Sequence, residues 1–137
     1  MYKRQFAIVD NRQYRLIRAV TPGPYVFILE ATREVPRRLS HPSRKTIGLR
    51  VPDHPIALAL LQELGQPLLA STLILPPDQT PMNDPEEIRA RLEKHIELII
   101  DGGACACEPS TVVDLTGDVP QIVRVGRGAL EPFGVTA

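Results

Sequence analysis

The chain has 137 residues, and its 16 basic and 16 acidic side chains give a formal net charge of zero at neutral pH. This length allows one domain with a buried hydrophobic core, and the balanced charge excludes a strong overall attraction to nucleic acid or membranes. No signal peptide or apolar run of membrane-spanning length is present, so we expect a cytoplasmic protein without a membrane partner.

Residues 1–5 carry neither a helix cap nor a hydrophobic pattern. We expect them to be a non-native or fragment end in front of one domain over residues 6–137. Asp10 or Asn11 can cap a helix that runs to Ala19 and ends before Pro22. Residues 25–29 are uncharged and predict an interior strand. Residues 32–44 are polar and basic, which predicts a surface connection with a short helical piece around residues 36–39.

Residues 45–77 read as a strand, a helix and a second strand. Residues 46–51 predict the first strand. Asp53 is expected to cap the helix, with Pro55 in its first turn, and the apolar residues 56–64 predict a helix that is covered on most sides. Gly65 is the expected helix stop, and residues 68–75 predict the second strand. A helical crossover between apolar strands favours parallel pairing.

Three polar side chains interrupt this apolar segment. Arg50 lies at the end of the first predicted strand, and Ser71 and Thr72 lie within the second. A guanidinium, a helix N-terminus and two hydroxyls brought together would suit an anionic ligand. The alternative is local, with Arg50 paired to a neighbouring carboxylate and the hydroxyls bonded to nearby backbone.

The remaining sequence predicts one helix, one short strand and a hairpin. Residues 84–87, Asp-Pro-Glu-Glu, are typical of a helix start, and Glu87 and Arg91 are spaced for an ion pair. Residues 98–100 predict a buried strand, and residues 111–115 and 121–125 predict a β-hairpin. Gly126 and Gly128 match a dinucleotide-binding loop only weakly, because the third glycine is missing.

Cys105 and Cys107 are separated by a single residue. A disulfide between them would be strained, and the three histidines are too scattered to complete a metal site. The sequence therefore predicts two reduced thiols and no metal centre.

Six phrases of the sequence, taken in order and spacing, resemble the YrdC/YciO-type domain, the family of L-threonylcarbamoyladenylate synthases. They are Thr-Pro-Gly-Pro at 21–24, Gly-Leu-Arg-Val-Pro-Asp-His-Pro at 48–55, Gly-Gln-Pro-Leu-Leu-Ala-Ser-Thr at 65–72, Asp-Gly-Gly at 101–103, Ser-Thr-Val-Val-Asp-Leu at 110–115 and Arg-Val-Gly at 124–126. Residues 73–77 and 84–88 resemble the YciO branch in particular.

The resemblance implies an α/β fold, with a twisted mixed parallel and antiparallel sheet, flanking helices and a concave basic cleft. It also implies a nucleotidyltransferase that has no tightly bound cofactor. This enzyme would convert L-threonine, bicarbonate and ATP, the last as its Mg²⁺ complex, into threonylcarbamoyl-AMP for tRNA modification. By position, Arg50, Ser71 and Ser110 would bind threonine, and Thr72 and Arg124 would bind the ATP phosphates.

Two departures from the family pattern predict little synthase activity for this chain alone. Thr-Leu-Ile at residues 72–74 replaces the family's Ser-Ala-Asn, so that Ile74 stands where an amide could contact ATP. The family's domain also begins well before Phe6, with a portion whose lysines and arginine bind triphosphate. The alternative function is an RNA-binding module without catalysis, in which a basic face over residues 33–45 binds tRNA or double-stranded RNA.

Overall fold

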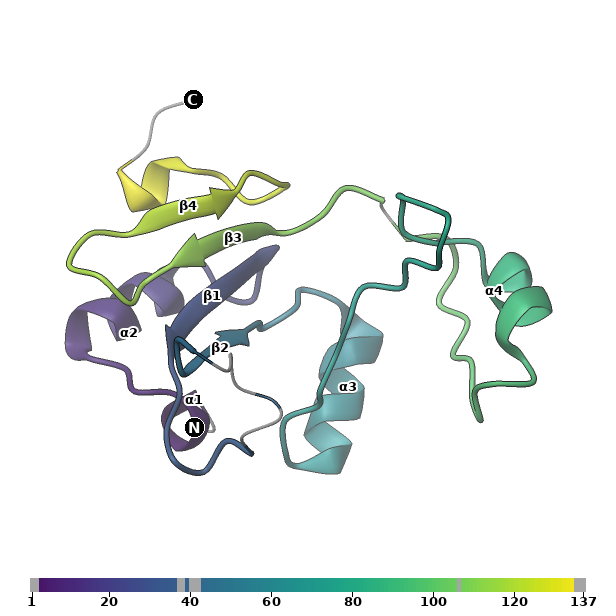
Figure 1. Ribbon diagram of the computed structural model, residues 1–137, viewed down its shortest axis with the longest axis horizontal. Helices are drawn as coiled ribbons and strands as arrows, with labels where there is room; N and C mark the ends of the chain where they lie inside the picture. The colour runs from purple at the N-terminus through teal and green to yellow at the C-terminus, as the bar shows by residue number, and fades with distance from the viewer. Residues whose placement is uncertain (1–2, 37–38, 40–42, 106, 135–137) are drawn as a thin grey trace. The chain divides into compact units, whose positions relative to one another are not determined.

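The computed structural model describes residues 3–36, 39, 43–105 and 107–134. The chain divides into two compact units, Met1–Pro67 with Pro109–Ala137, and Leu68–Glu108, and each unit is described by itself. Figure 1 shows the helices and strands in chain order: α1 Lys3–Phe6, α2 Asn11–Ala19, β1 Tyr25–Glu30, β2 Thr46–Leu49, α3 Pro55–Leu64, α4 Pro85–Leu92, β3 Thr111–Asp114, β4 Gln121–Arg124 and the 3₁₀ helix η1 Glu131–Phe133.

The first unit is built on a four-stranded sheet in the order β2-β1-β3-β4. β1 pairs with β3 in parallel and with β2 in antiparallel, and β3 and β4 form an antiparallel pair. This confirms the predicted mixed sheet, the interior position of β1 and the hairpin of β3 and β4. The predicted parallel pairing of residues 46–51 with residues 68–75 is wrong, because β2 pairs only with β1 among the described residues.

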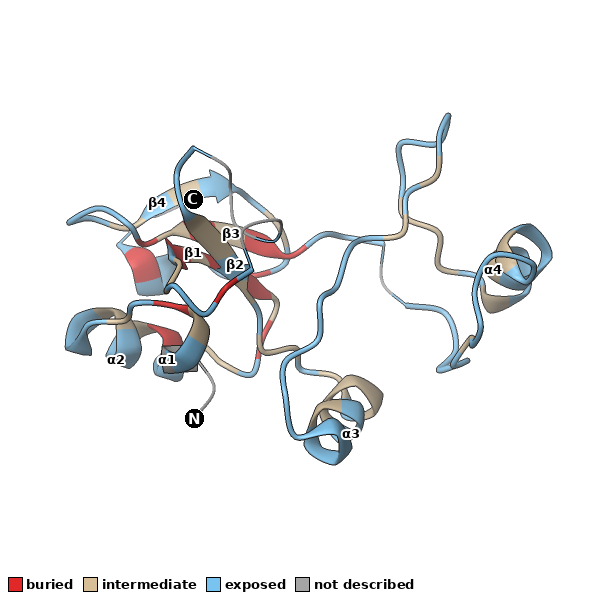
Figure 2. Cartoon of the chain, turned by 60° about the horizontal axis from the view of Figure 1, so that its bottom comes forward, coloured by how far each residue is buried: buried red, intermediate tan, exposed pale blue. Residues whose placement is uncertain are grey.

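One face of this sheet carries the hydrophobic core. Phe27, Leu29 and Val113 are almost completely buried, and Ile17 of α2 packs against them. Figure 2 shows buried residues in β1, β3, α2 and η1. Phe133 of η1 adds a ring 5.5 Å from that of Tyr25, in an edge-to-face contact.

The helix α2 begins and ends where the sequence predicted. The Asp10 side chain accepts a hydrogen bond from the Gln13 backbone, and the Gln13 side chain accepts one from the Asp10 backbone. This reciprocal pair is a capping box, which satisfies amides that the first helical turn leaves free. Ile17 faces the core, whereas Tyr14 of the same helix is 39% exposed.

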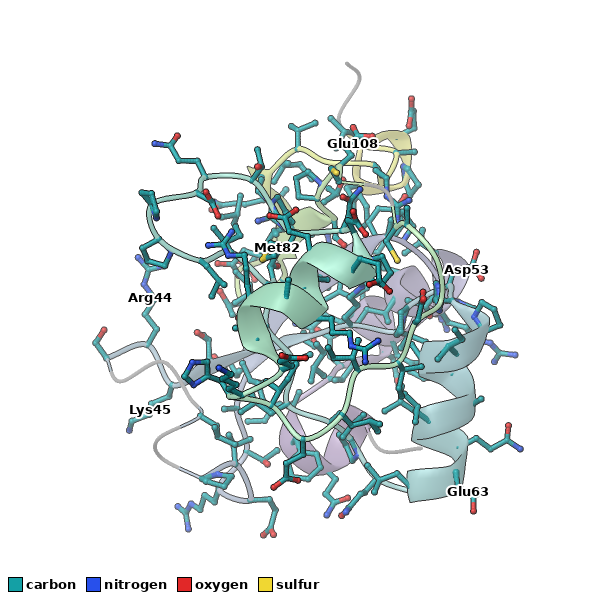
Figure 3. All side chains as sticks on the ribbon, turned by 90° about the vertical axis from the view of Figure 1, so that its right-hand side faces the viewer. Arg44, Lys45, Asp53, Glu63, Met82 and Glu108 are labelled. Carbon is teal, nitrogen blue, oxygen red and sulfur yellow. The ribbon has the colours of Figure 1, made fainter. Side chains whose placement is uncertain are left out.

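The helix α3 departs from the prediction at its start and in its burial. Its N-cap is His54, which makes no side-chain capping bond, so the prediction that Asp53 caps the helix is wrong. None of its residues is buried, although we expected cover on most sides. Figure 3 shows Asp53 and Glu63 projecting outward near its two ends. Gly65 has the predicted left-handed conformation, with φ 67°.

Among its described residues, the second unit contains a single helix, α4. The Asp84 side chain accepts from the Glu86 backbone amide at 3.0 Å, which confirms the predicted helix start. Arg91 contacts Glu87 at 3.5 Å, as predicted, and Asp78 at 2.6 Å. The hydrogen bond with Asp78 raises the pKa of Arg91 above its ordinary value, which favours the charged form of this side chain.

The two strands predicted for the second unit do not form. Residues 68–75 and 98–100 are irregular, and Leu69 and Leu98 are 79% and 74% exposed. Both predictions are wrong for this chain. The helical piece predicted around residues 36–39 falls partly outside the described residues. Within the part of the chain that is described, no helix is long and apolar enough to cross a membrane.

Candidate functional site

The sheet brings three of the five predicted site residues to one edge of the first unit. At this edge β1 and β3 begin, and β2 and β4 end, because each outer strand runs antiparallel to its neighbour (Figure 1). Arg50 directly follows β2, Ser110 directly precedes β3 and Arg124 is the last residue of β4. We call this group the basic edge.

Ser110 and Arg124 are in direct contact. The Arg124 guanidinium donates to the Ser110 carbonyl oxygen from Nε at 3.2 Å and from Nη2 at 2.9 Å. Ser110 is buried, whereas Arg124 is exposed. A guanidinium has five N–H donors in a planar fork, so three remain for an anionic ligand after these two bonds. The contact therefore holds the Arg124 head group at the start of β3 without using up its donors.

Arg50 stands on the other side of the basic edge. Its side chain is exposed and, among the described residues, no carboxylate lies within ion-pair distance of it. The next residue, Val51, accepts a hydrogen bond from the Gly23 amide at 2.9 Å, which joins the end of β2 to the turn before β1. β1 and β3 lie between β2 and β4, so the backbones at Arg50 and Arg124 are separated by three strand spacings, about 14 Å.

The loop after β4 is held against the basic edge by residues that sequence reasoning missed. Thr111 is fully buried, and its hydroxyl donates to the Gly128 carbonyl at 2.8 Å and accepts from the Gly126 amide at 3.1 Å. The Tyr25 hydroxyl donates to the Ala129 carbonyl at 3.1 Å. The sequence feature that could have identified these contacts is Thr111, next to the candidate Ser110, with glycines fifteen and seventeen residues after Thr111.

The glycines of this loop are required by packing. A Cβ at Gly126 would overlap the backbone of Pro109 and Ser110, and one at Gly128 would overlap the Tyr25 ring. Over residues 129–134, the described part of the chain that follows them, the only helix is a short 3₁₀ helix that contains Pro132. This agrees with the weak match to a dinucleotide-binding loop noted from the sequence.

Ser71 and Thr72 belong to the second unit, and both are exposed. The Ser71 hydroxyl donates to the Thr72 carbonyl at 3.4 Å, a long contact of the local kind that we kept as the alternative. Their predicted role in ligand binding stays a prediction.

A hollow of about 370 Å³ lies in the second unit, between α4 and residues 96–101. Its charged lining consists of four carboxylates and one guanidinium: Glu86, Glu93, Glu97, Asp101 and Arg89. None of the predicted site residues lines it, and its excess of negative charge does not suit a carboxylate or phosphate ligand. Among the described residues, no group of three or more side chains is arranged to hold a metal ion.

Comparison with known proteins gives consistent matches over most of the chain. A family model for Sua5, YciO and YrdC, described as telomere recombination, matches residues 2–126. The uncharacterized protein YciO of Escherichia coli is 53% identical over 128 residues, which cover 93% of this chain and 62% of that protein. The threonylcarbamoyl-AMP synthase of Schizosaccharomyces pombe is 35% identical over 133 residues, which cover 90% of this chain and 31% of that protein.

Two of the solved structures that match this chain illustrate its fold. The crystal structure of E. coli YciO superposes with a TM-score of 0.90 at 52% identity, over 96% of this chain and 64% of that one. The structure of P. abyssi Sua5 complexed with L-threonine gives a TM-score of 0.83 at 27% identity, over 96% of this chain and 39% of that one. The chain therefore spans less than two thirds of the length of these relatives.

Proposed function

The chain belongs to the Sua5/YciO/YrdC family, and from this premise we propose that its basic edge binds L-threonine and the phosphates of MgATP. The reaction that this binding would serve is that of a threonylcarbamoyl-AMP synthase. Arg50 and Ser110 contact threonine in this proposal, and Arg124 contacts phosphate. The resemblance implies threonine binding for Ser71 and phosphate binding for Thr72, and both roles stay predictions.

The match to a ligand-bound family structure carries the proposal, and a named relative supports it. A family structure that matches 96% of this chain at a TM-score of 0.83 is a complex with L-threonine. A relative that matches 90% of the chain is named threonylcarbamoyl-AMP synthase. The basic edge supplies what such ligands require, since guanidinium groups bind carboxylates and phosphates through paired, charge-assisted hydrogen bonds.

The chemistry needs positioned donors rather than a covalent nucleophile. The threonine amine attacks bicarbonate and water leaves, which gives a carbamate; a carbamate oxygen then attacks the α-phosphorus of ATP, and pyrophosphate leaves. Charge on the phosphoryl oxygens is stabilised by fixed cations and N–H groups in such displacements. Arg124 fits this role because its bonds to Ser110 fix its head group before a ligand arrives.

Binding is tested by isothermal titration of L-threonine, and of MgATP, into the chain and three variants. We expect Arg50→Ala to weaken threonine binding about tenfold or more, because a hydrogen bond to a charged group is worth about 1.5–3 kcal/mol. Arg124→Ala should weaken MgATP binding by a similar factor. Arg15→Ala, which removes an exposed arginine of α2, is the matched control.

Equal threonine affinity in Arg50→Ala and Arg15→Ala would contradict the proposed role of Arg50. Turnover is measured separately, as ATP consumption that depends on both threonine and bicarbonate. For this chain alone we expect binding with little turnover, because Ile74 stands where the synthases have an amide. Turnover at the rate of a full-length family synthase would contradict that expectation.

RNA binding is the second candidate function, favoured by the exposed basic residues of the connection between β1 and β2. Arg33, Arg44 and Lys45 are exposed, and Figure 3 shows Arg44 and Lys45 pointing away from the ribbon. The Ala31 amide donates to the Lys45 carbonyl at 2.8 Å, which closes this connection beside the sheet. A fluorescence titration with tRNA at two salt concentrations tests it. Absence of binding at low salt excludes this function, because phosphate contacts are strongest there.

A further inference from the structure

The two cysteines of the second unit occupy different chemical environments. Both are free and exposed. The Asn83 side-chain amide donates to the Cys107 sulfur at 3.0 Å, so Cys107 is a hydrogen-bond acceptor. The Cys105 thiol points at the Gly103 carbonyl at 3.9 Å, and a carbonyl can only accept. The two sulfurs therefore differ in their contacts, because Cys107 accepts from a positioned N–H donor and Cys105 faces an acceptor.

The orientation of the Asn83 amide is fixed by a second contact. The same Nδ2 donates to the Cys105 carbonyl oxygen at 2.9 Å, and only the NH₂ end of the amide can make that bond. The backbone on both sides of Asn83 is also fixed. Asp84 is the N-cap of α4, and the Met82 amide donates to the Leu73 carbonyl at 3.0 Å. The donor at Cys107 is thus positioned by the backbone around it.

We propose that Cys105 and Cys107 form a reversible peroxide-reactive dithiol, in which Cys107 is the nucleophile and Cys105 the resolving thiol. The proposal does not depend on ligand binding at the basic edge. It rests on three observations: both thiols are exposed, one residue separates them, and only Cys107 accepts from a fixed N–H donor. A thiolate, and not a thiol, is the species that attacks peroxide.

The reaction balances with hydrogen peroxide as the oxidant. The Cys107 thiolate attacks one peroxide oxygen and the O–O bond breaks, which gives a sulfenic acid on Cys107 and hydroxide. The Cys105 sulfur then attacks the Cys107 sulfur, the S–O bond breaks, and the departing hydroxide takes the proton of Cys105. Together with the proton that Cys107 released when it became a thiolate, the sum is one disulfide and two waters, with two sulfurs oxidised and the peroxide reduced.

The short spacing explains why the product would be reversible. A disulfide between residues two positions apart departs from the preferred Cα and Cβ separations and stores strain. Strained and exposed disulfides have the higher reduction potentials of labile, regulatory pairs. We therefore expect the resting pair to be reduced, as the sequence also predicts.

The test exposes the full chain to hydrogen peroxide and follows the free thiols by alkylation and mass spectrometry, with dimedone to trap sulfenic acid. In the unmodified chain we expect an intramolecular disulfide that dithiothreitol reverses. Cys105→Ser should accumulate a dimedone adduct on Cys107, and Cys107→Ser should react at least about threefold more slowly. Dimedone capture on Cys105, or equal rates in the two serine variants, would overturn the assignment of roles.

Asn83→Ala tests the positioned donor. We expect the reaction of Cys107 with peroxide to slow by about threefold, because the attacking sulfur loses its positioned N–H donor. Gln79→Ala removes another exposed amide of the same unit and serves as the control. An Asn83→Ala rate equal to that of the control would refute the role of Asn83, and disulfides formed only between chains would refute the pair.

Discussion

The substitution Gly126→Ala tests how the loop after β4 is fixed to the basic edge. A Cβ at this position would overlap the Pro109 carbonyl oxygen and would lie 2.6 Å from the Ser110 carbonyl carbon and 2.8 Å from the Ser110 oxygen. All three are backbone atoms, which cannot turn away as a side-chain end can. The loop must therefore move away from Ser110, and the bond from the Gly126 amide to the buried Thr111 hydroxyl is stretched or lost.

The loss of stability in Gly126→Ala is the sum of these two effects. Overpacking in a well-packed region costs about 1–3 kcal/mol, and a weakened buried hydrogen bond adds about 1 kcal/mol. We therefore expect the free energy of unfolding to fall by about 2–4 kcal/mol. For a domain of 60–100 residues, 1 kcal/mol corresponds to about 4–8 °C in Tm, so the melting temperature should fall by at least about 8 °C.

The assay is thermal and urea unfolding followed by circular dichroism, with Gly117→Ala as the matched control. Gly117 lies in the turn between β3 and β4, and a Cβ there would meet only the Val119 carbonyl oxygen, at 3.9 Å. The same change of one methyl group should shift Tm by no more than about 3 °C at this open position. If Gly126→Ala and Gly117→Ala melt within about 2 °C of each other, the close approach to Ser110 does not hold the loop.

Three further substitutions test other contacts of the first unit, and urea unfolding measures each of them. Thr111→Val should lower the free energy of unfolding by about 1–3 kcal/mol, because the Gly128 carbonyl and the Gly126 amide lose their partner. Thr111→Ser should retain most of that stability. Equal losses in the two variants would contradict the role of the hydroxyl. Asp10→Ala should cost about 1 kcal/mol through the lost capping box, whereas His54→Ala, at a cap without a side-chain bond, should change little. Phe133→Ala should cost about 3 kcal/mol because its buried ring contacts those of Tyr25 and Phe27; a loss below about 1 kcal/mol would show that η1 is not part of the core.

The features that the sequence predicted correctly are those that neighbouring residues determine. The cap at Asp10 and the cap at Asp84 each involve residues two or three positions away. The hairpin of β3 and β4 pairs Asp114 with Gln121 across a short turn. The six phrases that resemble the family also identified the mixed sheet correctly, although no short pattern specifies which strand lies beside which.

The incorrect predictions concern segments whose structure depends on distant partners. Residues 68–75 and 98–100 are apolar enough for strands, but a strand forms only when another strand satisfies its backbone hydrogen bonds. Thr46–Leu49 has such a partner in β1, and these two segments have none among the described residues. The exposure of Leu69 and Leu98 has the same cause, since an apolar side chain is buried only when another layer covers it.

The candidate site residues also differ in whether paired strands position them. The β3–β4 hairpin brings Arg124 to Ser110, and the antiparallel pairing of β2 with β1 places Arg50 at the same edge. Ser71 and Thr72 would need residues 68–75 to be fixed as a strand, and fixing eight backbones costs about 1 kcal/mol or more for each residue. Two hydroxyl contacts with a charged ligand return about 3 kcal/mol each at most. A ligand that contacted this segment only through Ser71 and Thr72 would therefore return less free energy than ordering it as a strand costs.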